Sequence, residues 1–373
     1  VEHLQAESRA LGGQATVAAA EHDELAGRVR DLLLRIPNTP SPDAPDGTGP
    51  ADNVVLRTEG PPVDSFAEHQ RVPHWEIGAQ LDLLDPERAT KLSGAMFTIY
   101  RGWGARLLRA MVNLSLDRSA DAYVEVRPPT LVRTDTMVAS GQLPKFEDDA
   151  YHVERDDLWA IPTAEVPLTS LHRDEVLAEA VLPLRYTAYS SCYRREAGAA
   201  GRDTRGLLRS HEFDKVELLA VAADEAQAKA CQENILARAE ALLGELGLAY
   251  RVLDLCAGDL GANAARTWDV EAYAPGTDQW LEVSSVSWFG EYQARRAAIR
   301  WRPTDATGTR MCQTVNGSAL GWPRTVAAYL ESHRRPDGTV GVVDALRPLL
   351  GVDTIPHPSP AAGSPGRLRH PDG

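Results

Sequence analysis

The sequence predicts an α+β protein built around an antiparallel β-sheet. Runs of β-forming residues follow one another through loops, without the regular crossover helices that a parallel sheet requires. Amphipathic helical patterns stand apart from these runs, at residues 104–118 and 224–246. With 373 residues, 43% hydrophobic and 25% charged, the chain is long enough for one large core and a smaller appendage. The predicted strands lie within residues 186–196, 209–222, 269–275 and 279–289.

The first 36 residues predict a short helical hairpin. Residues 15–36 repeat apolar side chains at helical spacing, with little turn chemistry among them. A shorter helical piece precedes them, in which Leu4 and Leu11 are seven residues apart, and Gly12 and Gly13 are expected to end it. The two pieces would then pair as a truncated arm over residues 1–36.

The rest of the chain divides into a proline-rich segment, a long central region and a polar tail. Five prolines lie in the stretch from Ile36 to Pro50 inclusive, too many for a helix or a central strand, so residues 37–62 predict a linker. Residues 63–355 show no internal boundary and predict a single mixed domain. The proline, glycine and serine residues of 356–373 predict a disordered tail.

The charge balance of the chain is acidic, with a formal net charge of −14 and a pI near 5.2. A general attraction to nucleic acids or anionic membranes is therefore not expected, and any polyanion must meet a local basic patch. No apolar run approaches the roughly 18 residues that span a bilayer, and the first residues show no signal-peptide pattern. These features predict a cytoplasmic protein that does not act at a membrane.

Residues 195–217 contain such a basic patch, in which a loop with Gly198, Gly201 and Gly206 separates two predicted strands. Alternation along the first strand puts Arg194 and Glu196 on one face. The basic residues of the segment are Arg195, Arg202, Arg205, Arg209 and Lys215, and the second strand presents Phe213, Lys215 and Glu217 at a period of two.

The side chains of this hairpin suit a nucleoside triphosphate. Arginine can bind phosphate oxygens through two hydrogen bonds, an aromatic ring offers a flat face to a purine, and a carboxylate accepts from an exocyclic amine. On spacing alone, a solvated hairpin with arginine–glutamate pairs on its surface fits equally well.

Residues 192–217, CYRREAGAAGRDTRGLLRSHEFDKVE, closely resemble the second signature of the class II aminoacyl-tRNA synthetases in its seryl-tRNA synthetase form. Three more segments are similar to other motifs of that family, in the family's order: IPTAEVPLTSLHRDEVL, QWLEVSSVSWFGEYQARR and TVNGSALGWPRTVAAYLES. The segment YVEVRPPTLV and the helix before it are similar to the first signature, which carries the dimer contact. The resemblance extends from about Pro37 to about Ile355 and implies a class II antiparallel sheet flanked by helices, with residues 63–355 as the catalytic domain.

The resemblance also implies an ATP site. Arg194 matches the residue that binds the α-phosphate, Glu196 the one that holds the adenine amino group, and Phe213 the ring that stacks on the base. Arg324 matches the arginine that meets the γ-phosphate, and Glu282 matches a ligand of Mg²⁺ and ATP. Arg194, Glu282 and Arg324 are the expected catalytic residues; the other positions matched to nucleotide binding are Arg195, Val283, Ser284 and Ser285, and Ser285 is matched to the metal as well.

A serine site is implied by the same comparison. Thr163 and Glu165 match the pair that holds the α-amino group of the amino acid, with Ala164 between them. Glu217 and Ser318 match positions that bind serine, Glu217 near the hydroxyl group. A site built to hydrogen-bond a hydroxyl group rejects an analogue that lacks it, because buried polar groups are then left unpaired.

The implied substrates and partners are L-serine, ATP with Mg²⁺, tRNA(Ser) and a second copy of the chain in a homodimer. Residues 1–36 contain six acidic residues against four arginines, so a short arm of this composition is expected to bind tRNA weakly. Two alternatives therefore remain. The aminoacyl group could pass to another acceptor, such as a carrier protein or a small molecule, or the chain could be a catalytically silent paralogue.

Overall fold

The structure is a computed structural model that describes residues 2–197 and 206–358. The chain divides into two compact units, Val1–Asn38 and Thr39–Gly373. Most of the predicted tail of residues 356–373, and the loop arginines Arg202 and Arg205, lie outside the described residues.

The smaller unit is one uninterrupted helix, α1 (Glu2–Arg35), so the predicted hairpin is wrong. Gly12 and Gly13 lie inside the helix and do not end it. Each glycine costs about 1 kcal/mol relative to alanine, a penalty that the alanine-rich flanks can outweigh where no proline or turn motif offers a reversal. Its large apolar side chains are exposed, except for the half-buried Leu34.

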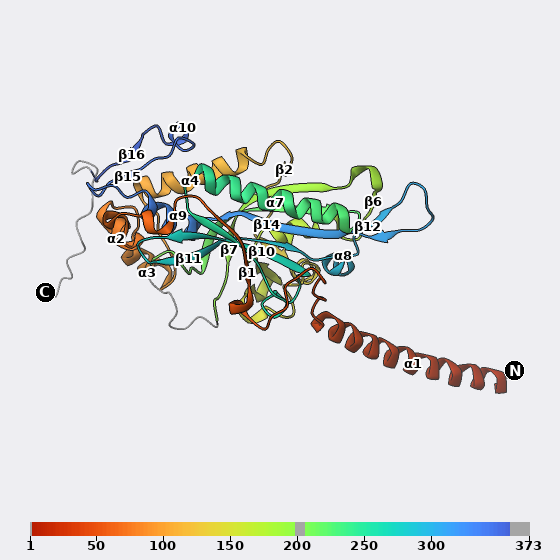
Figure 1. Ribbon diagram of the computed structural model, residues 1–373. Helices are drawn as coiled ribbons and strands as arrows, with labels where there is room; N and C mark the ends of the chain where they lie inside the picture. Colours follow the sequence, from red (N-terminus) through yellow and green to blue (C-terminus); the bar gives the residue numbers. More distant parts are fainter. Residues whose placement is uncertain (1, 198–205, 359–373) are drawn as a thin grey trace. The chain divides into compact units, whose positions relative to one another are not determined.

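The larger unit is built on an eight-stranded sheet, which confirms the predicted α+β class (Figure 1). Neighbouring strands pair antiparallel, except for the parallel pair at one edge, β2 with β7. Sequence neighbours such as β7 and β8 pair directly, as the absence of crossover helices predicted. The strands, in their order across the sheet, are β1 (Val54–Glu59), β9 (Tyr250–Asp254), β10 (Arg266–Ala274), β11 (Gln279–Trp288), β14 (Gln313–Gly321), β8 (Glu212–Ala222), β7 (Leu184–Tyr193) and β2 (Val124–Glu125).

The segment predicted as a linker, residues 37–62, is instead part of the larger unit from Thr39 onward. Its backbone is tied to that unit, since the Ser41 amide donates to the Ala265 carbonyl at 2.8 Å and the Pro45 carbonyl accepts from Ala257 at 2.9 Å. β1 lies within it and forms one edge of the sheet. The prolines of this segment lie before or after the strand, so they do not interrupt its hydrogen bonds, and Val54, Val55 and Leu56 suit a strand.

Long helices cover one face of the sheet (Figure 1). α7 (Glu225–Glu245) agrees with the helical pattern of residues 224–246, and the Asp224 side chain caps it by accepting from the Gln227 amide at 2.9 Å. Its apolar stripe packs on β14, β11 and β8 in the main core. Other helices that contribute to this core include α2 (His74–Gln80), α4 (Gly102–Asp117) and α9 (Trp322–Ser332).

Shorter elements complete the unit. Three small sheets are formed by β3 (Leu131–Arg133), β4 (Tyr151–Val153) and β5 (Leu158–Ala160); by β6 (Val176–Ala178), β12 (Arg300–Arg302) and β13 (Arg310–Met311); and by β15 (Val340–Gly341) with β16 (Thr354–Ile355). The short helices are α3 (Pro86–Ser93), α5 (Thr134–Ala139), α6 (Glu165–Thr169), α8 (Tyr292–Ala297) and α10 (Arg347–Leu350). Within the described ranges, each helix is too short or too polar to cross a bilayer.

Candidate active site

A cavity of about 560 Å³ lies in the larger unit, over the face of the sheet opposite α7. β8 shows why this face is polar. Val216 and Leu218 point into the main core, so the alternate residues Phe213, Lys215 and Glu217 point the other way and line the cavity. The predicted site residues that line the cavity are Thr163, Glu165, Arg194, Glu196, Phe213, Glu217, Glu282, Val283, Ser284, Ser285, Ser318 and Arg324.

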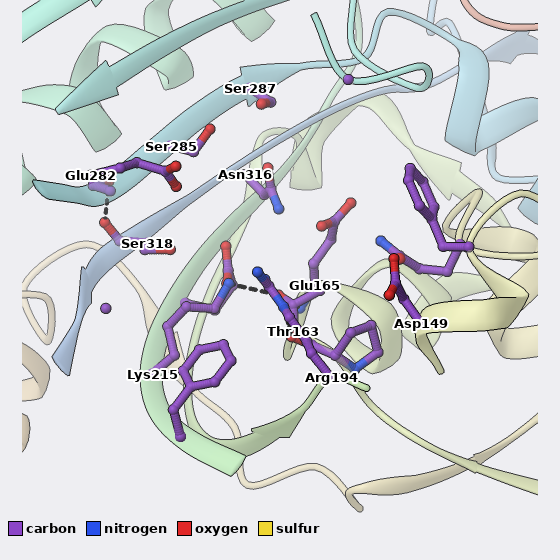
Figure 2. Close-up of a pocket in the computed structure, with 18 of the residues that line it drawn as sticks. Asp149, Thr163, Glu165, Arg194, Lys215, Glu282, Ser285, Ser287, Asn316 and Ser318 are labelled. Carbon is purple, nitrogen blue, oxygen red and sulfur yellow. Dashed lines mark hydrogen bonds and ion pairs between the residues drawn. The ribbon is translucent and has the colours of Figure 1, made fainter. Parts of the chain in front are cut away.

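Figure 2 shows that these side chains reach the cavity from several strands. Glu282, Ser285 and Ser287 come from β11, and Asn316 and Ser318 come from β14. Lys215 comes from β8, Arg194 directly follows β7, and Thr163 and Glu165 lie at the start of α6. Segments as far apart as residues 163 and 324 therefore meet in one place.

One end of the cavity carries the aromatic and basic groups of the hairpin. The Arg194 guanidinium lies 5.1 Å from the centre of the Phe213 ring, and its Nε donates to the Pro162 carbonyl at 3.4 Å. Glu196 has a left-handed backbone, with a φ of 51°, and accepts from Arg209 at 2.6 Å. These side chains combine an aromatic face with two guanidinium groups, which suits a purine and its phosphates.

Two predicted site residues do not reach the cavity. Arg195 is exposed, and its side chain donates to the Asp148 carbonyl at 3.2 Å while its amide donates to the Asp149 carbonyl at 2.8 Å. Arg194 and Glu196 line the cavity, whereas the residue between them is held on the outside by its contacts with Asp148 and Asp149. Ala164 is fully buried beneath the cavity wall at the start of α6.

A buried ion pair forms the floor of the cavity. Lys215 Nζ lies 2.5 Å from Glu217 Oε2, and the side chain of Glu217 is 1% exposed. Thr163 joins the pair, because its hydroxyl group donates to Glu217 at 2.9 Å and accepts from Lys215 at 2.9 Å. The three side chains satisfy one another, so the charged groups are held rigidly in a place that water barely reaches.

Glu165 is a second buried carboxyl group beside this floor. Burial raises the pKa of Glu165 to about 7, the Glu217 carboxylate adds to the rise, and Lys215 opposes it. Gln293 in α8 donates to Glu165 at 2.5 Å and to the Ser140 carbonyl at 3.0 Å. Two carboxyl groups close to one lysine leave this end of the cavity suited to bind an additional cation, such as an ammonium group.

A third part of the cavity lining combines an arginine with an accessible carboxylate. The side chain of Glu282 is 49% exposed, and its Oε2 lies 3.6 Å from Arg324. Arg324 also donates to the Glu282 carbonyl at 3.0 Å and to the Leu208 carbonyl at 3.1 Å. It lies in the first turn of α9, directly after Pro323, a residue that suits a helix start.

The donor set near Glu282 fits a magnesium ion. The Glu282 carboxylate and the Ser285 hydroxyl group both line the cavity. Behind them, Asp269 pairs with Ser285 in strand register, and its buried Oδ1 has no hydrogen-bond partner among the described residues. Burial and the Glu282 charge raise the pKa of Asp269, a cost that a nearby cation would offset. The described residues hold no cluster of three His, Cys, Asp or Glu side chains arranged for a metal. A Mg²⁺ site does not need such a cluster, because the ion takes much of its coordination from phosphates and water.

Several polar residues of the cavity were not assigned from the sequence. Lys215 and Asn316 line it, and each stands two residues from a predicted site residue on the same strand. The period of two had placed Lys215 on the face of Phe213 and Glu217 without giving it a role, and the same period could have identified Asn316. Arg209 had been noted only as a basic residue. Gln293 comes from a helix whose sequence shows no such pattern, and only the fold brings it to Glu165.

Comparison with known proteins agrees with this geometry. Residues 145–333 match the family described as the class II tRNA synthetase core domain (G, H, P, S and T). The serine–tRNA ligase of Gemmatimonas aurantiaca is 48% identical over 350 residues, which cover 93% of this chain and 81% of that protein. The chain belongs to the seryl-tRNA synthetases.

Other seryl-tRNA synthetases give the same result. The serine–tRNA ligase of Pelotomaculum thermopropionicum is 50% identical over 328 residues, covering 87% of this chain and 76% of that protein. Among solved structures, the seryl-tRNA synthetase of Pyrococcus horikoshii, crystallised with ATP, superposes with a TM-score of 0.87 at 34% identity, covering 95% of this chain and 84% of that one. The predicted family and fold are thereby confirmed.

Proposed function

We propose that the cavity binds ATP, Mg²⁺ and L-serine together and forms seryl-adenylate. As a seryl-tRNA synthetase, the chain ligates serine to tRNA in two steps, activation of the amino acid and transfer of the seryl group. The observation that carries the assignment of residues is the convergence of two chemically different ends in one cavity. An aromatic ring and guanidinium groups lie at one end, and a buried carboxyl cluster lies at the other.

In the activation step, a carboxylate oxygen of serine attacks the α-phosphorus of ATP. The bond between that phosphorus and the oxygen that bridges to the β-phosphate breaks, and pyrophosphate leaves. Negative charge grows on the phosphoryl oxygens during the attack, and Arg194 is the guanidinium we assign to it. Because the arginine is already held by Phe213 and the Pro162 carbonyl, little reorganisation is needed when the charge develops.

At the other end, Glu165 and Thr163 would hold the ammonium group of serine, and Glu217 and Ser318 its hydroxyl end. The cluster of Lys215, Glu217 and Thr163 presents preset hydrogen-bonding groups to a small polar side chain. An amino acid without a hydroxyl group would make no hydrogen bonds with these buried groups, which favours serine over alanine.

Glu282 and Ser285 would hold Mg²⁺ against the phosphates, where the ion would neutralise part of their charge. We expect Glu282→Gln to raise the Mg²⁺ concentration needed for half-maximal pyrophosphate exchange by about tenfold, since one charged ligand is lost. The matched control is Glu271→Gln, because Glu271 stands opposite Glu282 in strand register but pairs with Arg251 and does not line the cavity. An equal shift in both variants would show that Glu282 has no special role.

The raised pKa of Glu165 predicts a pH dependence of serine binding. Below pH 7 the carboxyl group is largely neutral and attracts an ammonium group weakly, and above pH 7 it is ionised. We therefore expect the KM for serine to fall by about tenfold between pH 6 and pH 8, following the ionised fraction. Glu165→Gln, measured in the same buffers, should show a higher KM with little pH dependence. A variant profile as steep as that of the wild type would contradict the assignment.

The acceptor that we propose is tRNA(Ser). Transfer to another acceptor finds no support, because the relatives described above are serine–tRNA ligases. We assign the contact with the acceptor end of the RNA to the loop arginines Arg202 and Arg205, which lie outside the described residues. A homodimer and a cytoplasmic location, where ATP and tRNA are available, complete the proposal. The dimer is supported by the exposed β2 edge, where Val124 is 62% exposed, and light scattering of the purified chain would test it.

Two assays test the proposed function in order. Serine-dependent exchange of pyrophosphate into ATP reports the activation step, and charging of purified tRNA(Ser) reports the transfer. We expect both activities. Absence of serine-dependent exchange would overturn the proposed use of the cavity, whereas exchange without any charged tRNA would overturn the proposed acceptor.

A further inference from the structure

A buried histidine outside the cavity, His74, connects two other segments by hydrogen bonds. The proposed function assigns it no role. His74 in α2 and Glu331 in α9 are both 0% exposed. His74 Nδ1 lies 2.8 Å from Glu331 Oε1, and the Leu207 amide donates to His74 Nε2 at 3.0 Å. Because a backbone amide can only donate, Nε2 must be the acceptor, so the ring carries its proton on Nδ1 and donates it to Glu331.

The carboxylate of Glu331 is held in place by further hydrogen bonds. Its Oε1 also accepts from the backbone amide of His74 at 2.9 Å. Its Oε2 accepts from the amides of Gly276 and Thr277 at 2.8 and 3.2 Å, in the turn between β10 and β11. Four donors satisfy a fully buried carboxylate without a positive partner among the described residues, so its position and that of the imidazole are both fixed.

On its other side, the His74 imidazole binds a segment that lines the cavity. Leu207, Leu208 and Arg209 line the cavity, and Gly206 precedes them with a φ of 74°. A Cβ atom at Gly206 would lie 2.2 Å from His74 Nε2, so the imidazole and the chain pack with no room for a side chain between them.

Two contacts therefore fix this short segment. His74 accepts from the Leu207 amide, and Arg324 donates to the Leu208 carbonyl at 3.1 Å. Arg324 and Glu331 both belong to α9, so one helix anchors the two contacts. The next residue, Arg209, pairs with Glu196 at the nucleotide end of the cavity.

We propose that His74 is a positioning residue for ATP. It fixes the backbone at Leu207, and thereby Arg209, in the nucleotide end of the cavity, although it contacts neither substrate. The inference rests on the proposed function, in which this end binds ATP, and it goes further by assigning part of the ATP affinity to a residue outside the cavity. A purely structural histidine would instead only hold α2 against α9.

Two substitutions separate the contacts of His74. In His74→Gln the side-chain amide reaches the place of Nε2 and can still accept from Leu207, whereas in His74→Asn it reaches only the place of Nδ1 and can still donate to Glu331. We expect His74→Asn to raise the KM for ATP in pyrophosphate exchange by about tenfold, the worth of one lost hydrogen bond in a buried site. His74→Gln should stay within about twofold of the wild type, and the KM for serine should stay unchanged in both.

His333→Asn is the matched control. His333 directly follows α9, near Glu331, but its side chain hydrogen-bonds to the Leu246 carbonyl, and neither residue lines the cavity. It should lower the melting temperature and leave the KM for ATP unchanged. Gly206→Ala leaves the His74 and Glu331 side chains unaltered but puts its Cβ atom against His74 Nε2, so it disturbs the same contact with Leu207. It provides a second route if the histidine variants do not fold, and it should also raise the KM for ATP.

The outcomes distinguish this inference from the proposed function. If the wild type shows no serine-dependent exchange, the proposed function fails. If the wild type is active, two results would show that His74 is structural only and would overturn the inference. In the first, His74→Asn and His74→Gln both keep the wild-type KM for ATP. In the second, they raise the KM for ATP and the KM for serine by the same factor. For Gly206→Ala, a KM for ATP equal to that of the wild type would overturn it in the same way.

Discussion

Replacing Arg194 with alanine is expected to lower kcat/KM for serine-dependent pyrophosphate exchange by about 10³-fold, the usual effect of removing a preorganised donor from a developing negative charge. The side chain stands over Phe213 and takes no part in an ion pair among the described residues, so its removal should leave the fold intact. Pyrophosphate exchange measures the effect directly, and the unfolding midpoint of the variant checks that it is folded.

The adjacent arginine provides the matched control. Arg195 has the same charge and length but faces away from the cavity and contacts the Asp148 carbonyl. Arg195→Ala should therefore change exchange by no more than about threefold, as expected for a surface substitution. Equal losses in the two variants would mean that the effect comes from the general charge of the hairpin, and the assignment of Arg194 to the α-phosphate would be wrong.

Glu217→Ala is expected to have the largest effect on stability. Removing this carboxylate leaves the Lys215 ammonium group buried without its partner, which costs about 3 to 5 kcal/mol of the free energy of unfolding. Serine activation should also be lost, because the same carboxylate is assigned to the serine hydroxyl. Urea denaturation measures the first effect and pyrophosphate exchange the second.

Two further variants separate stability from function at this position. In Lys215→Met with Glu217→Leu, apolar groups of similar size replace both charges, so most of the stability should return while exchange remains absent. In Glu245→Ala, an exposed pair with Arg118 is lost, and this should cost less than about 1 kcal/mol. A double variant that regained exchange would show that the buried pair does not contact serine.

The sheet and its polar face followed from the sequence because both depend on local periodicity. β7, β8, β10 and β11 overlap the predicted strands, and alternation along β8 placed Phe213 and Glu217 on one side. The same alternation, applied to the residues after β7, would have excluded Arg195, which the family resemblance had included. Local pattern was in this case the better guide to which side chains face the cavity.

The errors arose where tertiary context decides. The glycines of α1 break a helix only if a competing turn is more favourable, and single-residue propensities do not show that. β1 was hidden by the prolines before it, although its own residues favour a strand. Gln293 and His74 gain their roles from contacts with residues far away in sequence, and no spacing rule could have indicated them.

The central claim is that the nucleotide end and the serine end belong to one cavity. Isothermal titration with a stable sulfamoyl analogue of seryl-adenylate, which spans both ends, tests this most directly. We expect the analogue to bind at least about 10²-fold more tightly than serine or ATP alone, since it resembles the bound intermediate. Arg194→Ala and Lys215→Met/Glu217→Leu should each weaken that binding strongly. Loss of affinity in only one of these variants, or an affinity no better than that of ATP, would contradict the account.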